Sequence, residues 1–525
     1  MKNFASLYIL FSLLILTITG SCQESSPVEF GVSVDFNESH AINKDVYGVN
    51  NYVATRPYYT NYAGFIAKYN DLGKPLIRYP GGTFSNYYDF KTGFSEAFEG
   101  GGKKDSLRET SINAGITKYK LDTGGEDYRK FCDFVKKTGA EFTLSLNIVL
   151  HTAEENRELF EGFKAEGVEP KYVEMGNEVY NNSYQPAIPD VEKYIEIARA
   201  NMTVLREVFP DVKVGVVCPS HIYKYESFLD KVALGESDRQ IDWFNKLQNE
   251  DFFDAVIIHM YSVLGLDSDT PQDEYYPYKE AYKFCISHAD GKFEKTVDAM
   301  RAGYPGKDIW LTEYHIRDYG LTNYGMRLSY MGGFFTASFM LKLFNTPEVT
   351  VSNWHSLVQW LRFSNTTSLL PDNYDFTPLV NYHLFKVFKD PVSNSDYVVP
   401  LALTGMKKYQ GVGEYTGVYD DMEGSLFYSE TKASMIIFNK LEQPYTISEE
   451  NLLEALSGLD EATLDSCREF GPSESMSLDE ALNSETAYSD IIISAENGYY
   501  TLNPYSIYTF SFSHLTRRAD LTIDK

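Results

Sequence analysis

The chain has 525 residues and a formal net charge of −27, with 43% hydrophobic and 23% charged residues. This length exceeds the roughly 250–300 residues at which one hydrophobic core stops growing, so we expect a large domain and a smaller one. The negative charge argues against a protein that binds nucleic acid or a membrane surface, because such a protein needs a basic face.

The first 22 residues are typical of an export signal. Lys2 precedes an apolar run from Phe4 to Ile18, which is short for a membrane span and suits a signal peptide. The small residues that follow end at Cys22 and resemble a bacterial lipoprotein processing site, although Thr19 stands where leucine is usual. We expect a cell-envelope protein, in the periplasm or on the outer membrane, that touches the membrane only through a lipid anchor at Cys22. Plain secretion is the alternative.

Eight strand–helix units are expected between residues 45 and 392. The predicted strands lie in DVYGVN, PLIRYPGG, EFTLSLNIV, KYVEMGNE, VKVGVVCPS, DAVIIHMYS, DIWLTEYH and EVTVSNWHS. Several are apolar runs, as in strands buried on both faces, and several helices end at a glycine such as Gly73, Gly139 or Gly167. The pattern predicts an α/β fold, the (β/α)8 TIM barrel. A doubly wound sheet is the alternative, but no glycine-rich phosphate turn follows the first strand.

From residue 393 to 515 the pattern changes to period-two alternation, as in SDIIIS and GYYTLNPYSIYTFSFS, with a hairpin signal at Asn497-Gly498. This predicts a smaller, antiparallel C-terminal β-sandwich. The leading segment 28–44 also alternates and is expected to add a strand to it. Residues 516–525 are expected to form a frayed tail.

Four cysteines besides Cys22 are scattered along the chain and predict buried free thiols; they are Cys132, Cys218, Cys285 and Cys467. The nine histidines do not cluster, and the chain has no HExxH, GxSxG or Walker motif. We therefore expect neither a metal site nor a cofactor.

Polar residues close most of the predicted barrel strands, where the catalytic groups of such barrels lie. Two of them, Glu178 and Glu313, are carboxylates expected to face one cleft. Hydrolysis of a glycosidic bond needs such a pair, because one carboxyl must protonate the leaving oxygen while the other attacks the anomeric carbon. Burial and mutual repulsion can split their pKa values accordingly. We predict Glu178 and Glu313 as the catalytic residues and a carbohydrate as the partner.

Three residues are predicted to orient the carboxylates. Arg78 and Tyr261 are expected to donate hydrogen bonds to Glu313 and keep it ionised. His259 is expected to orient the sugar or Glu178. The alternatives are a structural ion pair for Arg78, simple packing for Tyr261 and a core position for His259.

Four further residues are predicted to bind the substrate. Asn177 would bind the sugar 2-hydroxyl, and Trp354 would stack on an apolar sugar face unless it only packs. Asn50 and Asn147 close the first and third strands and complete the set.

Three residues beside the site have other expected roles. Glu174 shares a strand face with Glu178, and we expect it to form a deeper structural ion pair. His315 and Asp318, just past the seventh strand, line a subsite or cap the next helix.

GNE at the end of the fourth strand and TEY at the end of the seventh resemble glycoside hydrolase clan A. Within that clan, LIRYPGGTFSNYYDF, KYVEMGNE and IIHMYS, in this order, are most similar to family 51, the α-L-arabinofuranosidases. The similarity covers roughly Val28 to His514. It implies a retaining O-glycosidase that works by double displacement, with Glu178 as acid/base, Glu313 as nucleophile, and Asn177 and Arg78 as their close partners.

Two features depart from family 51. Its first strand usually brings a glutamate to the sugar pocket, whereas this chain offers Asn50 and Asn51. A long insertion, about 93–125, also follows the second strand. The alternatives are therefore a clan A hydrolase of a red-algal galactan such as agar, porphyran or carrageenan, a xylosidase, or a glucuronidase. An alternative of another class is a non-catalytic glycan-binding surface lipoprotein.

The insertion is locally basic in an acidic protein; it carries Lys103, Lys104, Arg108, Lys118 and Lys120. Because it follows the second strand, we expect it on the active-site face, where it would bind sulfate or uronate groups of an anionic polysaccharide. A solvated loop is the alternative.

Overall fold

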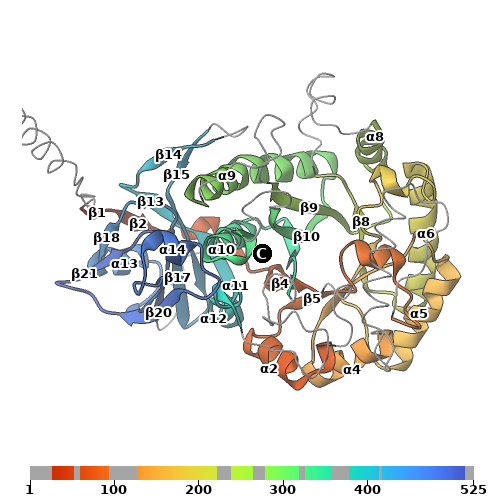
Figure 1. Cartoon of the computed structure of the whole chain (residues 1–525), viewed down its shortest axis with the longest axis horizontal. Helices are drawn as coiled ribbons and strands as arrows, with labels where there is room; N and C mark the ends of the chain where they lie inside the picture. Colours follow the sequence, from red (N-terminus) through yellow and green to blue (C-terminus); the bar gives the residue numbers. More distant parts are fainter. Residues whose placement is uncertain are drawn as a thin grey trace, which may run out of the picture.

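The computed structural model describes residues 26–51, 59–93, 127–220, 238–263, 278–317, 326–357, 378–412 and 417–514, and the statements below concern these residues. They form a closed barrel of eight parallel strands ringed by helices, with antiparallel sheets beside it (Figure 1). The predicted fold class is confirmed. The predicted export signal with Cys22, the predicted basic insertion, Asp318 and the predicted C-terminal tail lie outside the described residues.

The barrel strands follow one another around the barrel in sequence order, and the last pairs with the first through Trp354 and Val49. The strands are β4 (Gly48–Asn50), β5 (Leu76–Tyr79), β6 (Phe142–Ser145), β7 (Tyr172–Met175), β8 (Lys213–Val217), β9 (Ala255–Val263), β10 (Asp308–Arg317) and β11 (Val349–Trp354). The α-helices of this part are α2 (Ala63–Asp71), α4 (Tyr128–Thr138), α5 (Ala153–Ala165), α6 (Val191–Val208), α8 (Asp238–Leu247), α9 (Tyr278–Gly303), α10 (Tyr330–Phe344), α11 (Val380–Lys386) and α12 (Lys389–Asn394).

Local sequence explains where these helices begin and end. The Asp127 side chain accepts hydrogen bonds from two backbone N–H groups at the start of α4, and Thr152 forms a capping box with Glu155 at the start of α5. The glycines predicted to end helices, Gly73 and Gly139 among them, have positive φ angles of 85° and 68°. These caps return the chain to the barrel, where every residue of β5, β6 and β7 is buried.

The sandwich combines both ends of the described chain. Its seven-stranded sheet has the order β20-β19-β22-β17-β16-β12-β3, and a three-stranded sheet has the order β1-β18-β21. The strands are β1 (Val28–Glu29), β2 (Gly31–Ser33), β3 (His40–Ala41), β12 (Tyr397–Pro400), β13 (Ala402–Thr404), β14 (Lys408–Gln410), β15 (Val418–Asp420), β16 (Met422–Tyr428), β17 (Lys432–Asn439), β18 (Tyr445–Ser448), β19 (Thr463–Pro472), β20 (Tyr488–Ile493), β21 (Tyr499–Leu502) and β22 (Ser506–Ser513). Two helices, α13 (Glu449–Ala455) and α14 (Leu478–Leu482), accompany them. As expected, the leading segment joins this domain, because β1, β2 and β3 pair with β18, β13 and β12.

Short 3-10 helices connect several of these elements; they are η1 (Phe36–Glu38), η2 (Lys44–Val46), η4 (Tyr59–Asn61), η5 (Thr83–Tyr87), η6 (Asn182–Tyr184) and η8 (Met326–Leu328). The four cysteines other than Cys22 are buried and free, as predicted. None of the helices in the described ranges is long and apolar enough to cross a bilayer.

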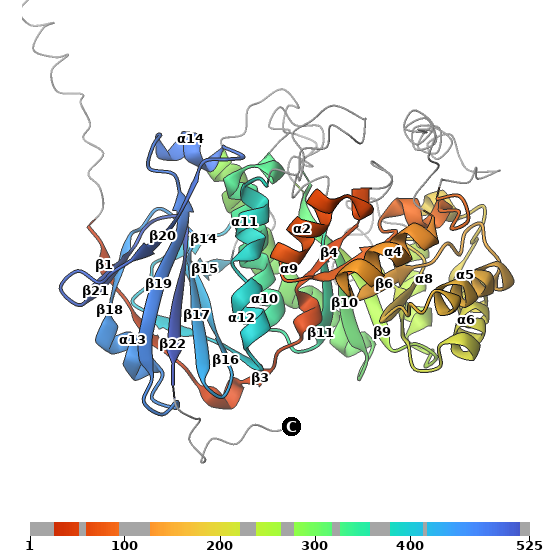
Figure 2. The ribbon, with the colours of Figure 1, turned by 90° about the horizontal axis from the view of Figure 1, so that it is seen from below.

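A buried group of charges joins the barrel to the sandwich, where α9 and α10 lie against the sandwich strands (Figure 2). Asp290 of α9 accepts from Lys342 of α10 at 2.6 Å, from Lys440 at 3.2 Å and from the Tyr409 hydroxyl at 2.7 Å. Lys342 also lies 3.0 Å from Glu423 of β16. Burial opposes the charge on Asp290, but the two ammonium groups hold the pKa of this carboxyl well below its ordinary value.

Asp290→Asn should lower the stability of the protein most strongly near neutral pH. The depressed pKa means that the stabilisation is present above the ordinary carboxyl pKa of 3.8 and is lost as the pH falls through the folded-state value. Removing one partner of a buried ion pair costs about 3–5 kcal/mol. Thermal melts between pH 7 and pH 3 should show that the difference in Tm between the wild type and Asp290→Asn becomes smaller as the pH falls.

Asp298→Asn, on the same helix, is the matched control, because Asp298 pairs with Arg301 at the surface and is 69% exposed. Exposed pairs of this kind contribute about 0–1 kcal/mol. Equal Tm values for the two variants at pH 7 would show that the buried charges do not stabilise the domain contact.

Candidate active site

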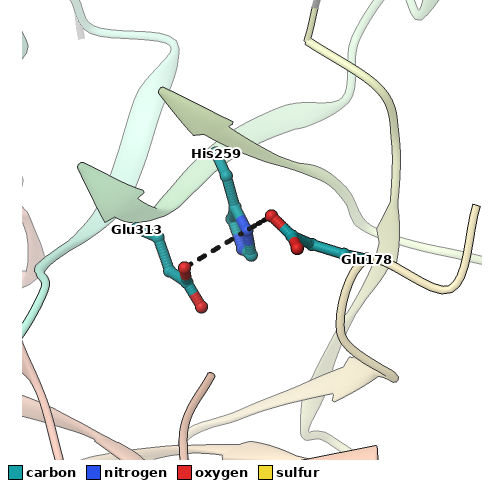
Figure 3. A group of neighbouring side chains, drawn as sticks. All are labelled: Glu178, His259 and Glu313. Carbon is teal, nitrogen blue, oxygen red and sulfur yellow. Dashed lines mark hydrogen bonds and ion pairs between the residues drawn. The ribbon is translucent and has the colours of Figure 1, made fainter. Parts of the chain in front are cut away.

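Four barrel strands bring the predicted residues together at their carboxyl ends. Arg78 lies on β5, Glu178 follows β7, His259 lies on β9 and Glu313 on β10. His259 and Glu313 are register partners on neighbouring strands and therefore point to the same face. Figure 3 shows the His259 ring between the two carboxylates.

The nearest oxygens of the two carboxylates lie close enough together for a retaining glycosidase. One oxygen of Glu178, one oxygen of Glu313 and a ring nitrogen of His259 all lie within 4.8 Å of one another. Retaining glycosidases separate their two carboxyl groups by about 5–5.5 Å, whereas inverting enzymes leave about 6.5–9.5 Å for an intervening water. The arrangement therefore suits direct attack by a carboxylate on the anomeric carbon.

Glu178 is aimed by a tight turn after β7. Gly176 has a φ of 89°, and Glu178 itself has a φ of 48°, in the left-handed region that non-glycine residues rarely adopt. Asn86 of η5 holds the turn, because its Nδ2 donates to the Asn177 carbonyl at 2.6 Å and its Oδ1 accepts from the Asn177 N–H at 3.0 Å. Sequence reasoning missed Asn86, although it lies in the TFSNY stretch that follows β5.

Asn86→Asp should lower kcat without removing the fold. A carboxylate still accepts from the Asn177 N–H but cannot donate to its carbonyl, so one hydrogen bond of the turn is lost. We expect kcat/KM to fall about tenfold or more, since leaving a buried acceptor unpaired costs about 1–3 kcal/mol. Steady-state kinetics and a thermal melt measure both effects. Wild-type kinetics in a folded variant would mean that the turn does not depend on Asn86.

Glu313 is held as an anion. Its Oε1 accepts from Arg78 Nη1 at 2.7 Å, and its Oε2 accepts from the Tyr261 hydroxyl at 2.6 Å. Burial alone would raise the pKa of this carboxyl, but the positive charges of His259 and Arg78 and the hydrogen bond from Tyr261 hold it well below the ordinary range. Donors on both oxygens and a low pKa suit a nucleophile.

Arg78 is fully buried and donates hydrogen bonds to three side chains, those of Glu174, Glu313 and Asn177. Its Nε and Nη2 donate to Glu174, at 2.9 and 2.7 Å, and Nη2 also donates to Asn177 Oδ1 at 2.8 Å. Burial opposes the charge, but Glu174 and Glu313 raise the pKa of the guanidinium above its usual value. Glu174 thus forms the deep ion pair that was expected. Because Asn177 Oδ1 is used, only its Nδ2 group remains for a sugar hydroxyl.

Asn50 and Asn147 make contacts within the protein. Asn50, fully buried beside Arg78 in the strand register, donates from Nδ2 to the Thr312 carbonyl at 3.3 Å. Asn147 donates to the Tyr88 carbonyl, and its Oδ1 accepts from the N–H groups of the two residues that start the next loop. These three hydrogen bonds of Asn147 hold the neighbouring loops in place.

Trp354 is packed inside the protein at the end of β11. Its ring is fully buried between His315 and Phe385 of α11, with centroid distances of 5.8 and 5.4 Å, so no ring face is open to a sugar. The next residue, His355, packs edge-on against Tyr261 instead. Burial lowers the pKa of His355 to about 4. His315 is also buried, and its Nδ1 hydrogen-bonds to Thr336 of α10.

The three residues of Figure 3 also have the spacing of a metal site. Both oxygens of Glu313 are already bonded to donors, however, and the Arg78 guanidinium lies 2.7 Å from one of them. A divalent cation here would be repelled by that guanidinium. The contacts therefore suit an acid–base pair better than a metal centre.

Comparisons with known proteins identify solved structures that share this fold. No protein-family model matches the sequence, and no curated protein matches it. Among solved structures, the glycoside hydrolase family 51 arabinofuranosidase of Xanthomonas axonopodis pv. citri is similar over 92% of this chain and 100% of its own, with a TM-score of 0.64 and 14% identity. An α-L-arabinofuranosidase from Thermotoga maritima, in an arabinose complex, matches over 92% of this chain and 100% of its own at a TM-score of 0.60 and 15% identity.

A xyloglucanase of Paenibacillus polymyxa, from glycoside hydrolase family 44, matches over 93% of this chain and 100% of its own, with a TM-score of 0.57 and 13% identity. At these identities the likeness establishes the fold, a barrel with an attached β-domain. The three solved structures described here are glycoside hydrolases.

Proposed function

We propose that the protein is a retaining glycoside hydrolase that acts on an oligosaccharide or polysaccharide by double displacement. The observation that carries the proposal is the pair Glu178 and Glu313, one sugar ring's width apart in unequal surroundings. Glu313 has donors on both oxygens and is 8% exposed, while Glu178 contacts His259 and is 27% exposed. The shared fold of known glycosidases supports this assignment.

In the first step Glu178 gives a proton to the glycosidic oxygen, and the bond from this oxygen to the anomeric carbon breaks. Glu313 attacks the same carbon and forms a glycosyl–enzyme ester. In the second step Glu178 removes a proton from water, which displaces Glu313. Asn177 Nδ2 is placed to bind the sugar 2-hydroxyl, a contact that strengthens as positive charge develops on the ring.

The preferred substrate is an α-L-arabinofuranoside, on the likeness to family 51 in motifs and fold. A red-algal galactan, a xyloside or a glucuronide is the alternative, because the same carboxylate pair serves these substrates and Asn50 stands where family 51 usually has a glutamate. An anionic polysaccharide remains a proposal that depends on the basic insertion. A screen of nitrophenyl glycosides and of plant and algal polysaccharides, including matched sulfated and desulfated oligosaccharides, distinguishes these possibilities.

Product stereochemistry tests the mechanism independently of the sugar. We expect the first product seen by NMR to keep the anomeric configuration of the substrate, because two displacements at one carbon restore it. Inversion would contradict the role of Glu313 as nucleophile. The absence of hydrolysis on every glycoside, combined with saturable binding of a glycan, would favour a glycan-binding lipoprotein.

We further propose that the protein is exported and lipid-anchored at Cys22, on the leader sequence alone. Cys22→Ser should move the protein from the membrane fraction to the soluble fraction of the cell envelope. If the wild type is already soluble there, the protein is secreted without an anchor.

A further inference from the structure

His259 lies between the catalytic carboxylates, yet the two-step mechanism above gives it no task. Its Nδ1 is 2.9 Å from Glu178 Oε1 and 3.6 Å from Glu313 Oε2. Its Nε2 is 3.2 Å from Thr312 Oγ1. The side chain is only 4% exposed, and the short contact of the ring is with Glu178 (Figure 3).

The charges around His259 favour an extra proton. Three carboxylates, Glu174, Glu178 and Glu313, share the site with one guanidinium, Arg78. A protonated His259 adds a second positive charge and partly balances this excess. The excess of negative charge remains when the groups that face His259 are counted element by element. β5 contributes Arg78, and the turn after β7 contributes Glu178. β10 contributes Glu313 and the neutral Thr312, and β11 leads into His355.

The pKa values agree with this count. Burial opposes a charge on His259, but Glu313 and the bond to Glu178 raise the pKa of the imidazole above 6.5, against a smaller opposing effect of Arg78. His355 shows the contrast, because burial lowers its pKa to about 4 and leaves it neutral at physiological pH. Of these two histidines at the site, His259 is the one suited to hold a proton.

Thr312 keeps its hydrogen bond to His259 whichever charge the ring carries. Its hydroxyl can accept a hydrogen bond, and it accepts from Nε2–H both in the imidazolium and in the neutral ring that remains once the Nδ1 proton has left. Glu178 accepts from Nδ1–H of the imidazolium and, once it has taken that proton, donates to Nδ1. The proton that moves is therefore the one at Nδ1.

We propose that His259 and Glu178 hold the catalytic proton jointly, with His259 carrying it in the resting enzyme and passing it to Glu178 during the reaction. The inference rests on the proposed glycosidase function and extends it. His259 acts through Glu178 and does not touch the substrate, which replaces the earlier expectation that it binds or orients the sugar.

The proton balance is complete over one turnover. In the first step the Nδ1 proton moves to Glu178 and from there to the glycosidic oxygen, which keeps the electron pair of the broken bond. The neutral His259 and ionised Glu178 are then one proton short. In the second step Glu178 takes a proton from the attacking water, Glu313 regains its electron pair, and the proton returns to Nδ1.

Kinetics of His259→Asn on two leaving groups test the proposal. A dinitrophenyl glycoside needs no protonation to leave, so we expect its kcat/KM, which reports the first step alone, to fall less than about tenfold. A natural disaccharide should lose about 100-fold, within the range of general acid catalysis. The alkaline limb of kcat/KM for the disaccharide should also move to lower pH. Equal losses on both substrates with an unmoved limb would mean that His259 only fills space.

Thr312→Val and Thr312→Ser form a matched pair. Valine keeps the shape but removes the hydroxyl that stabilises the imidazolium, so the alkaline limb should move to lower pH, as in His259→Asn. Serine keeps the hydroxyl, so the alkaline limb of the kcat/KM profile should stay at its wild-type pH. Equal limbs in the two variants would contradict the role of Thr312 and with it the joint holding of the proton.

A substrate-free measurement separates this inference from the proposed function. His259 is assigned in the NMR spectrum of [15N]histidine-labelled full-length protein by the signal missing from His259→Asn. We expect it to titrate above 6.5 in the wild type and at lower pH in Glu178→Gln, which removes a negative partner. A value at or below 6.5, or no change in Glu178→Gln, overturns the proposal. A wild type that hydrolyses no glycoside overturns the function instead.

Discussion

Glu313→Gln is expected to reduce hydrolysis at least about 10⁴-fold, because an amide can neither attack the anomeric carbon nor form the glycosyl–enzyme ester. The fold should survive, since glutamine keeps the side-chain volume and still accepts from Arg78 or Tyr261 through its carbonyl oxygen. Measurements of kcat/KM on the best glycoside of the screen, together with a thermal melt, give both results. Activity within about tenfold of wild type would remove the proposed mechanism.

Azide separates the roles of the two carboxylates. In Glu313→Gly, azide fills the vacated space and attacks from the nucleophile's side, so the product is a glycosyl azide of inverted configuration. In Glu178→Gly, with an activated leaving group, azide replaces the water of the second step and the configuration is retained. The reverse pattern would mean that the acid/base and the nucleophile have been exchanged.

Arg78→Met is expected to impair both stability and catalysis. The variant leaves Glu174 buried without its cation, and breaking a buried pair in this way costs about 3–5 kcal/mol. It also removes a positive charge that lowers the pKa of Glu313, so that pKa should rise. Because catalysis needs ionised Glu313, the acidic limb of the pH–activity profile should move to higher pH. Thermal melts and pH profiles measure the two effects.

A double variant tests whether the cost comes from Glu174. In Arg78→Met/Glu174→Gln the buried anion is gone, so we expect part of the lost Tm to return while catalysis stays impaired. Arg157→Met is the surface control, since Arg157 pairs with the exposed Glu154 and Glu207. Simple addition of the two single effects in the double variant would contradict the ion-pair explanation.

The site residues that lie at the ends of the barrel strands could be predicted from the sequence. The apolar runs end where polar residues begin, and this placed Arg78, Glu178, Tyr261 and Glu313 at one edge of a parallel barrel. Eight such units, with helices that end at glycine, are compatible with few folds other than the (β/α)8 barrel. The contacts among these residues then follow from the closure of the barrel, which the repeat of the pattern predicts.

The side-chain direction at the end of β11 was beyond the sequence. SNWHS offers two neighbouring rings, and alternation along a strand puts them on opposite faces without saying which faces inward. The choice depends on register, because Trp354 pairs with Val49 and lies against Phe385. His355 is therefore the residue of this pair that lies beside Tyr261.

The residues that support the catalytic groups could not be predicted from the sequence either. Asn86 and Thr312 carry no motif, and their roles arise only when chain segments distant in sequence meet. Asn147 shows that a polar residue at a strand end can also hydrogen-bond to the loop that follows it. Such roles depend on hydrogen-bond geometry, which residue type and spacing do not specify.

Strands from both ends of the described chain pair in one domain, so the barrel is topologically an insertion within the sandwich. When the chain emerges from the ribosome or from the export channel, β1 to β3 have no partners until about 350 further residues have followed. Folding during emergence therefore begins with the barrel, and the sandwich closes last. For the same reason the C-terminal domain cannot be cut off and grafted as an intact cassette, since its leading strands would stay behind.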